Sequence, residues 1–309
     1  MSFTKRHLRY VIELNKGSNA QSGPGDTFDN GSNVLDLRDL RSVASIQSSV
    51  GGNTPFGSSG IIQIWGMKPS DMAQLSTLGF YLNRYNRNKI TVFAYDDDNL
   101  PNASQVYVGN IYTARINYNA MPDVSLELEC HATLDQQTQI ISGTSASGTS
   151  DVASMLQGIC AACIPQVTFV NKGVTAKLAN HAVGGSPAHQ IADICNAASV
   201  CYALQDDTLT IWNNNTNIDG VIVTTGPKMG MVGYPEYNMQ GMDITMAFDP
   251  EVQWGRQISI VADDDAPPIP GVPGTYWINI AGHELSSEMP DGPWFTHASV
   301  SKMNMAGRT

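Results

Sequence analysis

The chain has 309 residues, more than one hydrophobic core usually supports, so two or three domains are expected. Its 17 Lys and Arg against 28 Asp and Glu give a charge of −11, which argues against a protein that grips duplex nucleic acid through a basic surface. Hydrophobic residues make up 42% of the sequence and charged residues 15%, which excludes wholesale disorder.

The sequence predicts neither a membrane span nor a secretory signal. No uncharged apolar run reaches about 18 residues. The N-terminus is basic, but no apolar signal core follows it, so synthesis in the cytoplasm is expected.

Residues 1–132 are predicted to form a first antiparallel β domain. Short β-branched and aromatic runs separated by turn residues indicate strands at 8–14, 61–67, 89–95, 106–116 and 124–130. One short helix is expected after Pro69, with Ser70 as its cap and Gly79 as its stop. The polar run 15–33 is too long for a hairpin and is interpreted as a functional or mobile loop.

Residues 133–230 have the pattern of a small α+β module. After a Gly/Ser/Thr linker, apolar residues from Val152 to Cys163 recur at helical spacing, and Pro165 ends this helix. Ser186 and Pro187 start a second helix. A short strand is expected at 167–170, and a hairpin at 200–204 and 208–212.

Residues 231–309 return to β structure, with strands expected at 242–248, 257–261, 276–285 and 294–300. The last two should pair across a turn at 290–293, and the proline-rich stretch 267–274 should be an extended loop. The predicted fold is therefore mainly β, with two antiparallel β-barrel-like domains on either side of an α+β insert.

The cysteines fit a structural role better than a chemical one. There are five, and in a protein made in the cytoplasm they should be reduced and buried. Cys160 and Cys163 have C-x-x-C spacing, but they close a predicted helix, whereas a redox motif should open one. A zinc site would need a second ligand pair, and Cys195 with Cys201 or His189 has the wrong spacing.

No motif of a known active site is present, and no catalytic, cofactor-binding or metal-binding residue is predicted. His283 and Glu284 are neighbours in a predicted strand, so their side chains should point to opposite faces. The acidic runs 96–98 and 263–265 offer oxygen ligands for a cation, yet neither continues as a calcium loop, and solvated turns are the preferred interpretation.

Acidic residues accumulate in the second half of the chain. Between residues 178 and 266 only Lys228 and Arg256 are basic, whereas eleven residues are acidic: Asp193, Asp206, Asp207, Asp219, Glu236, Asp243, Asp249, Glu251, Asp263, Asp264 and Asp265. Such a region would repel a polyanion, as suits a conduit through which nucleic acid slides, although ordinary solubility charge explains it equally well. The basic cluster Lys5, Arg6, His7 and Arg9 either meets an acidic partner or faces water.

The order of a strand at 61–67, a short helix and a strand at 89–95 resembles the opening domain of the central hub proteins of contractile-tailed bacteriophage baseplates, and three segments resemble motifs of the same family. They are 106–114, VYVGNIYTA, followed by Pro122-Asp123 and a last strand; 248–258, FDPEVQWGRQI; and the closing hairpin 283–296, HELSSEMPDGPWFT. Each motif consists of turn-forming residues between strands and is weak evidence by itself. The stronger evidence is that the motifs occur in the same order as in the family, over roughly 200 residues.

The resemblance implies a structural, non-enzymatic virion protein of the tail baseplate. It implies a homotrimer in which two barrel-like domains per chain imitate six-fold symmetry, so that one face fits the hexameric tail tube and the other the trimeric spike. Baseplate wedge proteins would then be further partners. Genomic DNA would pass through the lumen during ejection without specific binding, and no membrane or cofactor is involved.

Two other functions stay open at this point. One is a tail-associated peptidoglycan hydrolase, for which the available acids are Glu13, Glu127, Glu129, Glu284 and Glu288. The other is a receptor- or carbohydrate-binding module, for which Trp212, Trp254 and Trp294 are the exposed-looking aromatic residues, although such residues more often anchor cores and interfaces.

Overall fold

The computed structural model describes residues 5–14, 27–48, 57–76, 88–96, 102–262 and 272–302. The chain divides into two compact units. Unit 1 consists of residues 1–46, 59–132 and 283–294, and unit 2 consists of residues 47–58, 133–282 and 295–309. Among the described residues, the helices are too short and too polar to cross a membrane.

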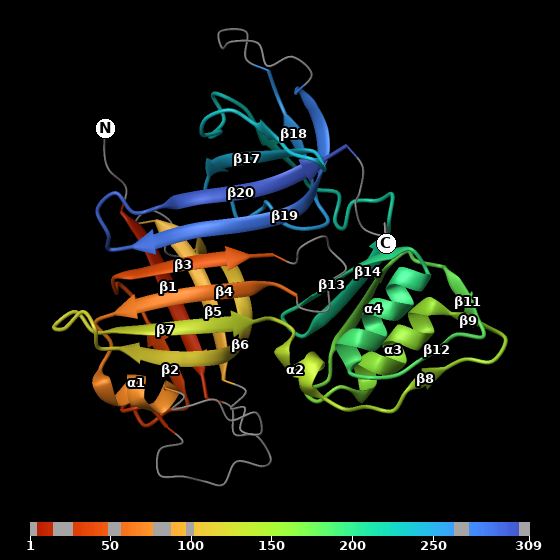
Figure 1. The fold of residues 1–309 in the computed structure, drawn as a ribbon, viewed down its shortest axis with the longest axis horizontal. Coiled ribbons are helices and arrows are strands. Elements are labelled where there is room, and N and C mark those ends of the chain that lie inside the picture. The colour runs from red at the N-terminus through yellow and green to blue at the C-terminus, as the bar shows by residue number, and fades with distance from the viewer. Residues whose placement is uncertain are drawn as a thin grey trace. The chain divides into compact units, whose positions relative to one another are not determined.

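Unit 1 is an antiparallel sheet with one short helix (Figure 1). Its hydrogen-bonded strand order is β2-β1-β5-β6-β7-β4-β3, followed by β19, whose last residues belong to this unit. The elements that lie in its first two segments are β1 (Arg6–Glu13), β2 (Val34–Leu37), β3 (Ser42–Gln47), β4 (Ser59–Trp65), α1 (Pro69–Leu75), β5 (Lys89–Asp96), β6 (Ser104–Asn117) and β7 (Ser125–His131).

Alternating burial along β1 contributes to the core of unit 1. In β1 the side chains of Leu8, Tyr10 and Ile12 are fully buried, and in the register of the sheet they face Ala94, Val92 and Ile90 of β5. Residues two apart on a strand share one face, so this pattern fixes which face of β1 packs inward.

All five strands predicted for residues 1–132 are confirmed, but β2 and β3 were missed. The predicted cap of α1 is wrong: the N-cap is Lys68, two residues before Ser70, and the helix begins at Pro69, because a proline fits its first position. The Ser70 hydroxyl instead donates a hydrogen bond to the Asp29 carboxylate. Gly79 and most of the 15–33 loop lie outside the described residues.

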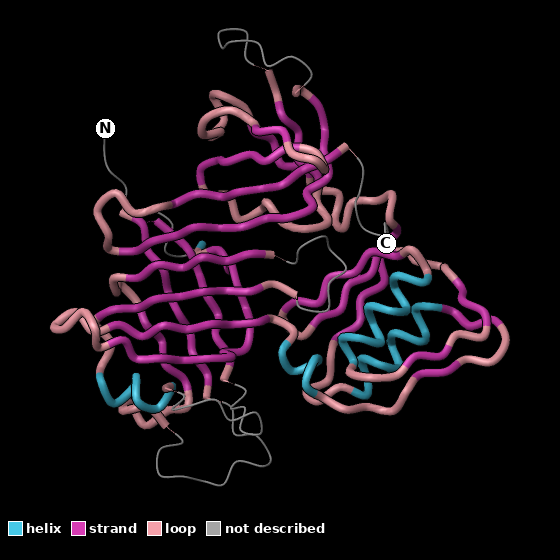
Figure 2. The backbone as a smooth tube through the Cα atoms, viewed as in Figure 1, coloured by secondary structure: helices cyan, strands magenta, loops and turns pink. Residues whose placement is uncertain are grey.

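The α+β part of unit 2 packs two helices on a small sheet of order β10-β14-β13, in which β10 runs parallel to β14 (Figure 2). Its elements are α2 (Leu134–Thr138), β8 (Thr144–Ser145), β9 (Thr149–Asp151), α3 (Val152–Ala162), β10 (Thr168–Lys172), β11 (Lys177–Ala179), β12 (Ala182–Val183), α4 (Pro187–Ala197), β13 (Val200–Gln205) and β14 (Thr208–Asn213).

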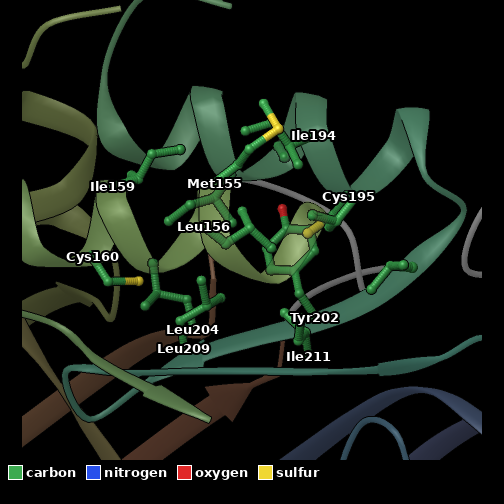
Figure 3. Close-up of a cluster of buried hydrophobic side chains, with 14 of the residues drawn as sticks. Met155, Leu156, Ile159, Cys160, Ile194, Cys195, Tyr202, Leu204, Leu209 and Ile211 are labelled. Carbon is green, nitrogen blue, oxygen red and sulfur yellow. The ribbon is translucent and has the colours of Figure 1, made fainter. Parts of the chain in front are cut away.

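Both predicted long helices are confirmed, with their caps. The Asp151 carboxylate accepts a hydrogen bond from Ser154 N at 3.2 Å, and the Ser186 hydroxyl accepts one from His189 N at 3.4 Å. Figure 3 shows the apolar stripe of α3, including Leu156 and Ile159, packed with α4 and with side chains from the sheet.

The β part of unit 2 has the order β16-β17-β20-β19-β18-β15, in which β15 runs parallel to β18. Its own core lies around Ile258, Val252 and Ile278, which are fully buried. The strands are β15 (Ile222–Thr225), β16 (Glu236–Tyr237), β17 (Met242–Ala247), β18 (Gln257–Ile260), β19 (Gly274–Ser287) and β20 (Trp294–Ser301).

The predicted fold class is confirmed: the protein is mainly β, with large antiparallel sheets and few helices. Among the described strands, each β part is an open path of neighbours. The four strands predicted after residue 231 are present, and β20 lies beside β19 as expected. The division at residues 132 and 230 stays a prediction, and most of the proline-rich loop lies outside the described residues.

Candidate assembly surfaces

The segment 222–239 of unit 2 carries six exposed large apolar side chains. They are Ile222, Met229, Val232, Tyr234, Tyr237 and Met239. Tyr234 and Tyr237 are 62% and 66% exposed, and Met239 is fully exposed. Scattered exposed hydrophobic residues are normal on a protein surface, but six within eighteen residues make this segment a candidate interaction surface.

The same segment forms both ends of the described strand order in this part of unit 2. Among the described strands, β15 pairs with β18 alone and β16 with β17 alone, so in this part of the structure each has one edge without a neighbouring strand. An open edge offers backbone donors and acceptors to another chain. The tyrosines and the strand edge therefore lie on one stretch of chain that suits a partner strand.

Charge restricts which strand can add to β16. Glu236 lies directly opposite Asp243 of β17 in the register, and both are exposed. Like charges at directly opposite positions destabilise a sheet, and charges on an edge strand discourage indiscriminate pairing. A partner that brings a basic side chain to this position would relieve the repulsion.

Unit 1 has a smaller set of exposed apolar residues. Ile61 on β4 is 66% exposed, and Tyr118 and Met121 are exposed in the connection from β6 to β7. Tyr112 on β6 lies edge-on to the His131 ring, with ring centroids 5.6 Å apart. These residues make a second, less continuous candidate surface.

The α+β part adds a pair of exposed isoleucines, Ile140 and Ile164, that are held together by one side chain. The Gln139 amide oxygen accepts a hydrogen bond from Ile164 N at 2.8 Å, and its nitrogen donates to the Ile164 carbonyl. Ile140 is 97% exposed. This pair forms a small apolar projection.

The predicted basic cluster at the N-terminus contacts groups of its own unit. Lys5 Nζ lies 2.7 Å from Glu288 Oε1, and Arg9 makes two hydrogen bonds to the Asp36 carboxylate, at 2.9 and 3.0 Å. Arg6 lies over the Trp294 ring, 5.8 Å from its centroid. Lys5, Arg6 and Arg9 therefore each interact with a residue of unit 1.

The acidic residues between 178 and 266 are only partly neutralised. Asp219 pairs with Arg256 at 2.6 Å and Asp193 with His181 at 3.1 Å, whereas Glu236 and Asp243 face each other. Asp206 and Asp207 form the turn between β13 and β14. Residues 97–98 of the first acidic run and 263–265 of the second lie outside the described residues, while Asp96 ends β5.

The cysteines lie in cores and carry no disulfide among the described residues. Burial raises the pKa of the Cys160 thiol to about 12, with Cys163 adding to the shift, and it raises that of Cys163 to about 11. A redox or zinc role requires the opposite shift, toward the thiolate. His283 is buried and Glu284 exposed, as strand alternation predicts.

Two of the three tryptophans considered for ligand binding are not surface groups. Trp212 is fully buried and Trp254 is 3% exposed, and their ring centroids lie 6.0 Å apart. Trp254 Nε1 donates to the Tyr202 carbonyl at 3.3 Å. The expectation of exposed aromatic residues is wrong for this pair, because their rings pack with Cys201 in a small buried cluster of unit 2.

Solved structures with a similar fold come from tail proteins. A tail protein of Neisseria meningitidis MC58 matches with a TM-score of 0.60 and 12% identity, over 95% of this chain and 96% of that chain. The 43 kDa tail protein of prophage MuSo2 from Shewanella oneidensis matches with a TM-score of 0.56 and 9% identity, over 96% and 98%.

A third similar structure is the E. coli protein c3393, a component of the type VI secretion system that exhibits structural similarity to the T4 bacteriophage tail proteins gp27 and gp5. Its TM-score is 0.55 at 9% identity, over 85% of this chain and 73% of that chain. At such identities the likeness shows the fold alone. No curated protein matches the sequence.

The sequence itself shows the family. The family described as Baseplate hub gp41 matches residues 76–299, which include all three segments that carried the resemblance and the whole α+β part. The chain therefore belongs to the Baseplate hub gp41 family and is a structural protein of the phage tail baseplate.

Proposed function

We propose that the protein is the central hub of a contractile tail, a homotrimer that joins the hexameric tail tube to the trimeric spike. It acts by geometry and performs no catalysis. Two β parts in each chain give six sheet modules per trimer, which is the number needed to meet six-fold symmetry on one face and three-fold symmetry on the other.

The exposed segment 222–239 carries this proposal. Its two strand edges and six apolar side chains would be costly to leave in water, and obligate oligomers bury such surface between subunits. The similar fold of c3393, a type VI secretion component that itself resembles the T4 tail proteins gp27 and gp5, supports the same kind of role.

The excess of acidic residues supports a role in DNA ejection. In a ring of three chains, an acidic lumen would repel the phosphate backbone and let genomic DNA pass without sticking. Baseplate wedge proteins would contact the outside of the ring.

Light scattering on purified protein, alone and co-expressed with the tube and spike proteins, tests the trimer. We expect a mass of three chains, with assembly abolished by Tyr237→Glu, which places a charge among the exposed apolar residues. Thr149→Glu adds the same charge on β9, where Thr149 is exposed, and should leave assembly intact. A monomer under every co-expression condition would contradict the proposal.

A further inference from the structure

Three side chains from distant parts of unit 1 converge on one point. His7 lies near the start of β1, Asp39 in the connection from β2 to β3, and Glu288 directly after β19. His7 Nδ1 lies 3.1 Å from Asp39 Oδ1 and 3.5 Å from Glu288 Oε1. The three atoms all lie within 4.8 Å of one another.

The neighbourhood holds these atoms in place. The His7 side chain is only 8% exposed, and its ring is stacked on Tyr95 of β5 with centroids 5.2 Å apart. Tyr95 is also the partner of His7 in the register of the sheet. The ring is therefore fixed on one side by packing, and Nδ1 is directed at the two carboxylates.

The spacing suits a metal ion. In a tetrahedral zinc site with bonds of about 2.0–2.1 Å, neighbouring ligand atoms lie about 3.3 Å apart. The two distances from His7 Nδ1, 3.1 and 3.5 Å, fall on either side of this value. To surround a cation, the atoms at these two edges need to shift by only a few tenths of an ångström, and the third pair, Asp39 and Glu288, lies within 4.8 Å.

We propose that His7, Asp39 and Glu288 form a binding site for one divalent transition-metal ion, with Zn²⁺ as the best-suited ion. One imidazole nitrogen and two carboxylate oxygens are a borderline ligand set that zinc accepts, whereas calcium takes six to eight oxygens. Water would fill the remaining position, because the Asp39 side chain is 66% exposed and opens the site to solvent.

Lys5 competes with the metal. Its ammonium lies 2.7 Å from Glu288 Oε1, the same oxygen that faces His7. The Lys5 side chain is 57% exposed, so it can move into water when a divalent ion takes over the neutralisation of Glu288. Metal binding therefore replaces the Lys5 ammonium with a divalent ion as the cation next to Glu288.

A bound ion would fasten three segments that are far apart in the sequence. It would tie β1 and the β2–β3 connection to the turn between β19 and β20, which contributes to unit 1 from the end of the chain. Because the ion binds only the folded arrangement, it would stabilise unit 1 by mass action.

The test uses the untagged full chain and Zn²⁺. Native mass spectrometry and titration calorimetry should find one zinc per chain, and Co²⁺ in its place should give the visible absorption of a low-symmetry site. Asp39→Asn and Glu288→Gln preserve shape and should each weaken zinc binding by about 100-fold. Lys5→Met should tighten it by about threefold.

Asp193→Asn is the matched control. Asp193 pairs with His181 at 3.1 Å as Asp39 pairs with His7, but no third ligand joins that pair among the described residues. This variant should bind zinc as the parent does. The proposal is overturned if the parent binds no zinc at 100-micromolar-range concentrations, or if the Asp39 and Glu288 variants retain parental affinity, or if Asp193→Asn loses binding equally.

Discussion

Gly255 lies against the indole ring of Trp212, so close that a Cβ at position 255 would stand 2.7 Å from Trp212 Cζ2. Gly255 also has a φ of +87°, in the left-handed region. Two constraints, one of backbone and one of packing, therefore require glycine at this position of the segment 248–258 that carried the resemblance.

Replacing Gly255 by alanine should destabilise unit 2 by about 3 kcal/mol. About 1 kcal/mol comes from the left-handed backbone and the rest from forcing the Trp212 ring aside. Gly220→Ala is the control, because Gly220 has a φ of +79° but nothing within 4 Å of the added Cβ. Chemical denaturation of both variants separates the two contributions, and equal losses would contradict the role of Trp212.

Asp36 should make the stability of unit 1 depend on acid pH. Hydrogen bonds from Arg38 and Arg9 lower the pKa of its carboxyl to about 2. A lowered pKa means that the carboxylate stabilises the fold above about pH 4 and that this contribution is lost as the pH falls toward 2.

The corresponding variant is Asp36→Asn. It should cost at most about 1 kcal/mol near neutral pH, because solvent screens this partly exposed carboxylate. The difference in stability between parent and variant should shrink as the pH falls from about 4 to about 2. Thermal melts of both proteins across this pH range measure the difference in stability. A difference that does not change with pH would refute the proposed contribution of Asp36.

The cysteines should be inert in the folded protein. All five are buried, and burial holds the pKa of Cys163 at about 11, so few thiolates exist at pH 8. A colorimetric thiol reagent should detect no fast-reacting group in native protein and five after denaturation. Thr149→Cys, at an exposed site, should add one fast group; rapid reaction of the parent would contradict the structure.

The pair Glu236 and Asp243 should make β16 intrinsically weak. Glu236→Gln removes a like-charge contact and should stabilise the protein by about 0.3 kcal/mol at low salt, with the gain fading as salt is added. Glu13→Gln is the contrast, because Glu13 lies opposite Lys89 in the register of β1 and β5. Glu13→Gln should lower the stability of the protein. If both substitutions changed the stability in the same direction, the electrostatic explanation would be disproved.

Local pattern was enough to predict the elements that have strong periodicity. The stripe from Val152 to Cys163 and the alternation in β1 each identify their element, because burial of one face follows directly from spacing. The short strands β2, β15 and β16 were missed, because two to four residues contain little periodicity, and the six-residue β3 was missed as well.

The sequence by itself determined the fold class and, through the order of three turn motifs, the family. Only the tertiary structure decided which residues meet. His7, Asp39 and Glu288 are separated by up to 281 positions and come together solely because β19 returns to the N-terminal sheet. Likewise Trp212 and Trp254, 42 positions apart, are buried because they pack together with Cys201 in one cluster, a contact that no local pattern of hydrophobicity encodes.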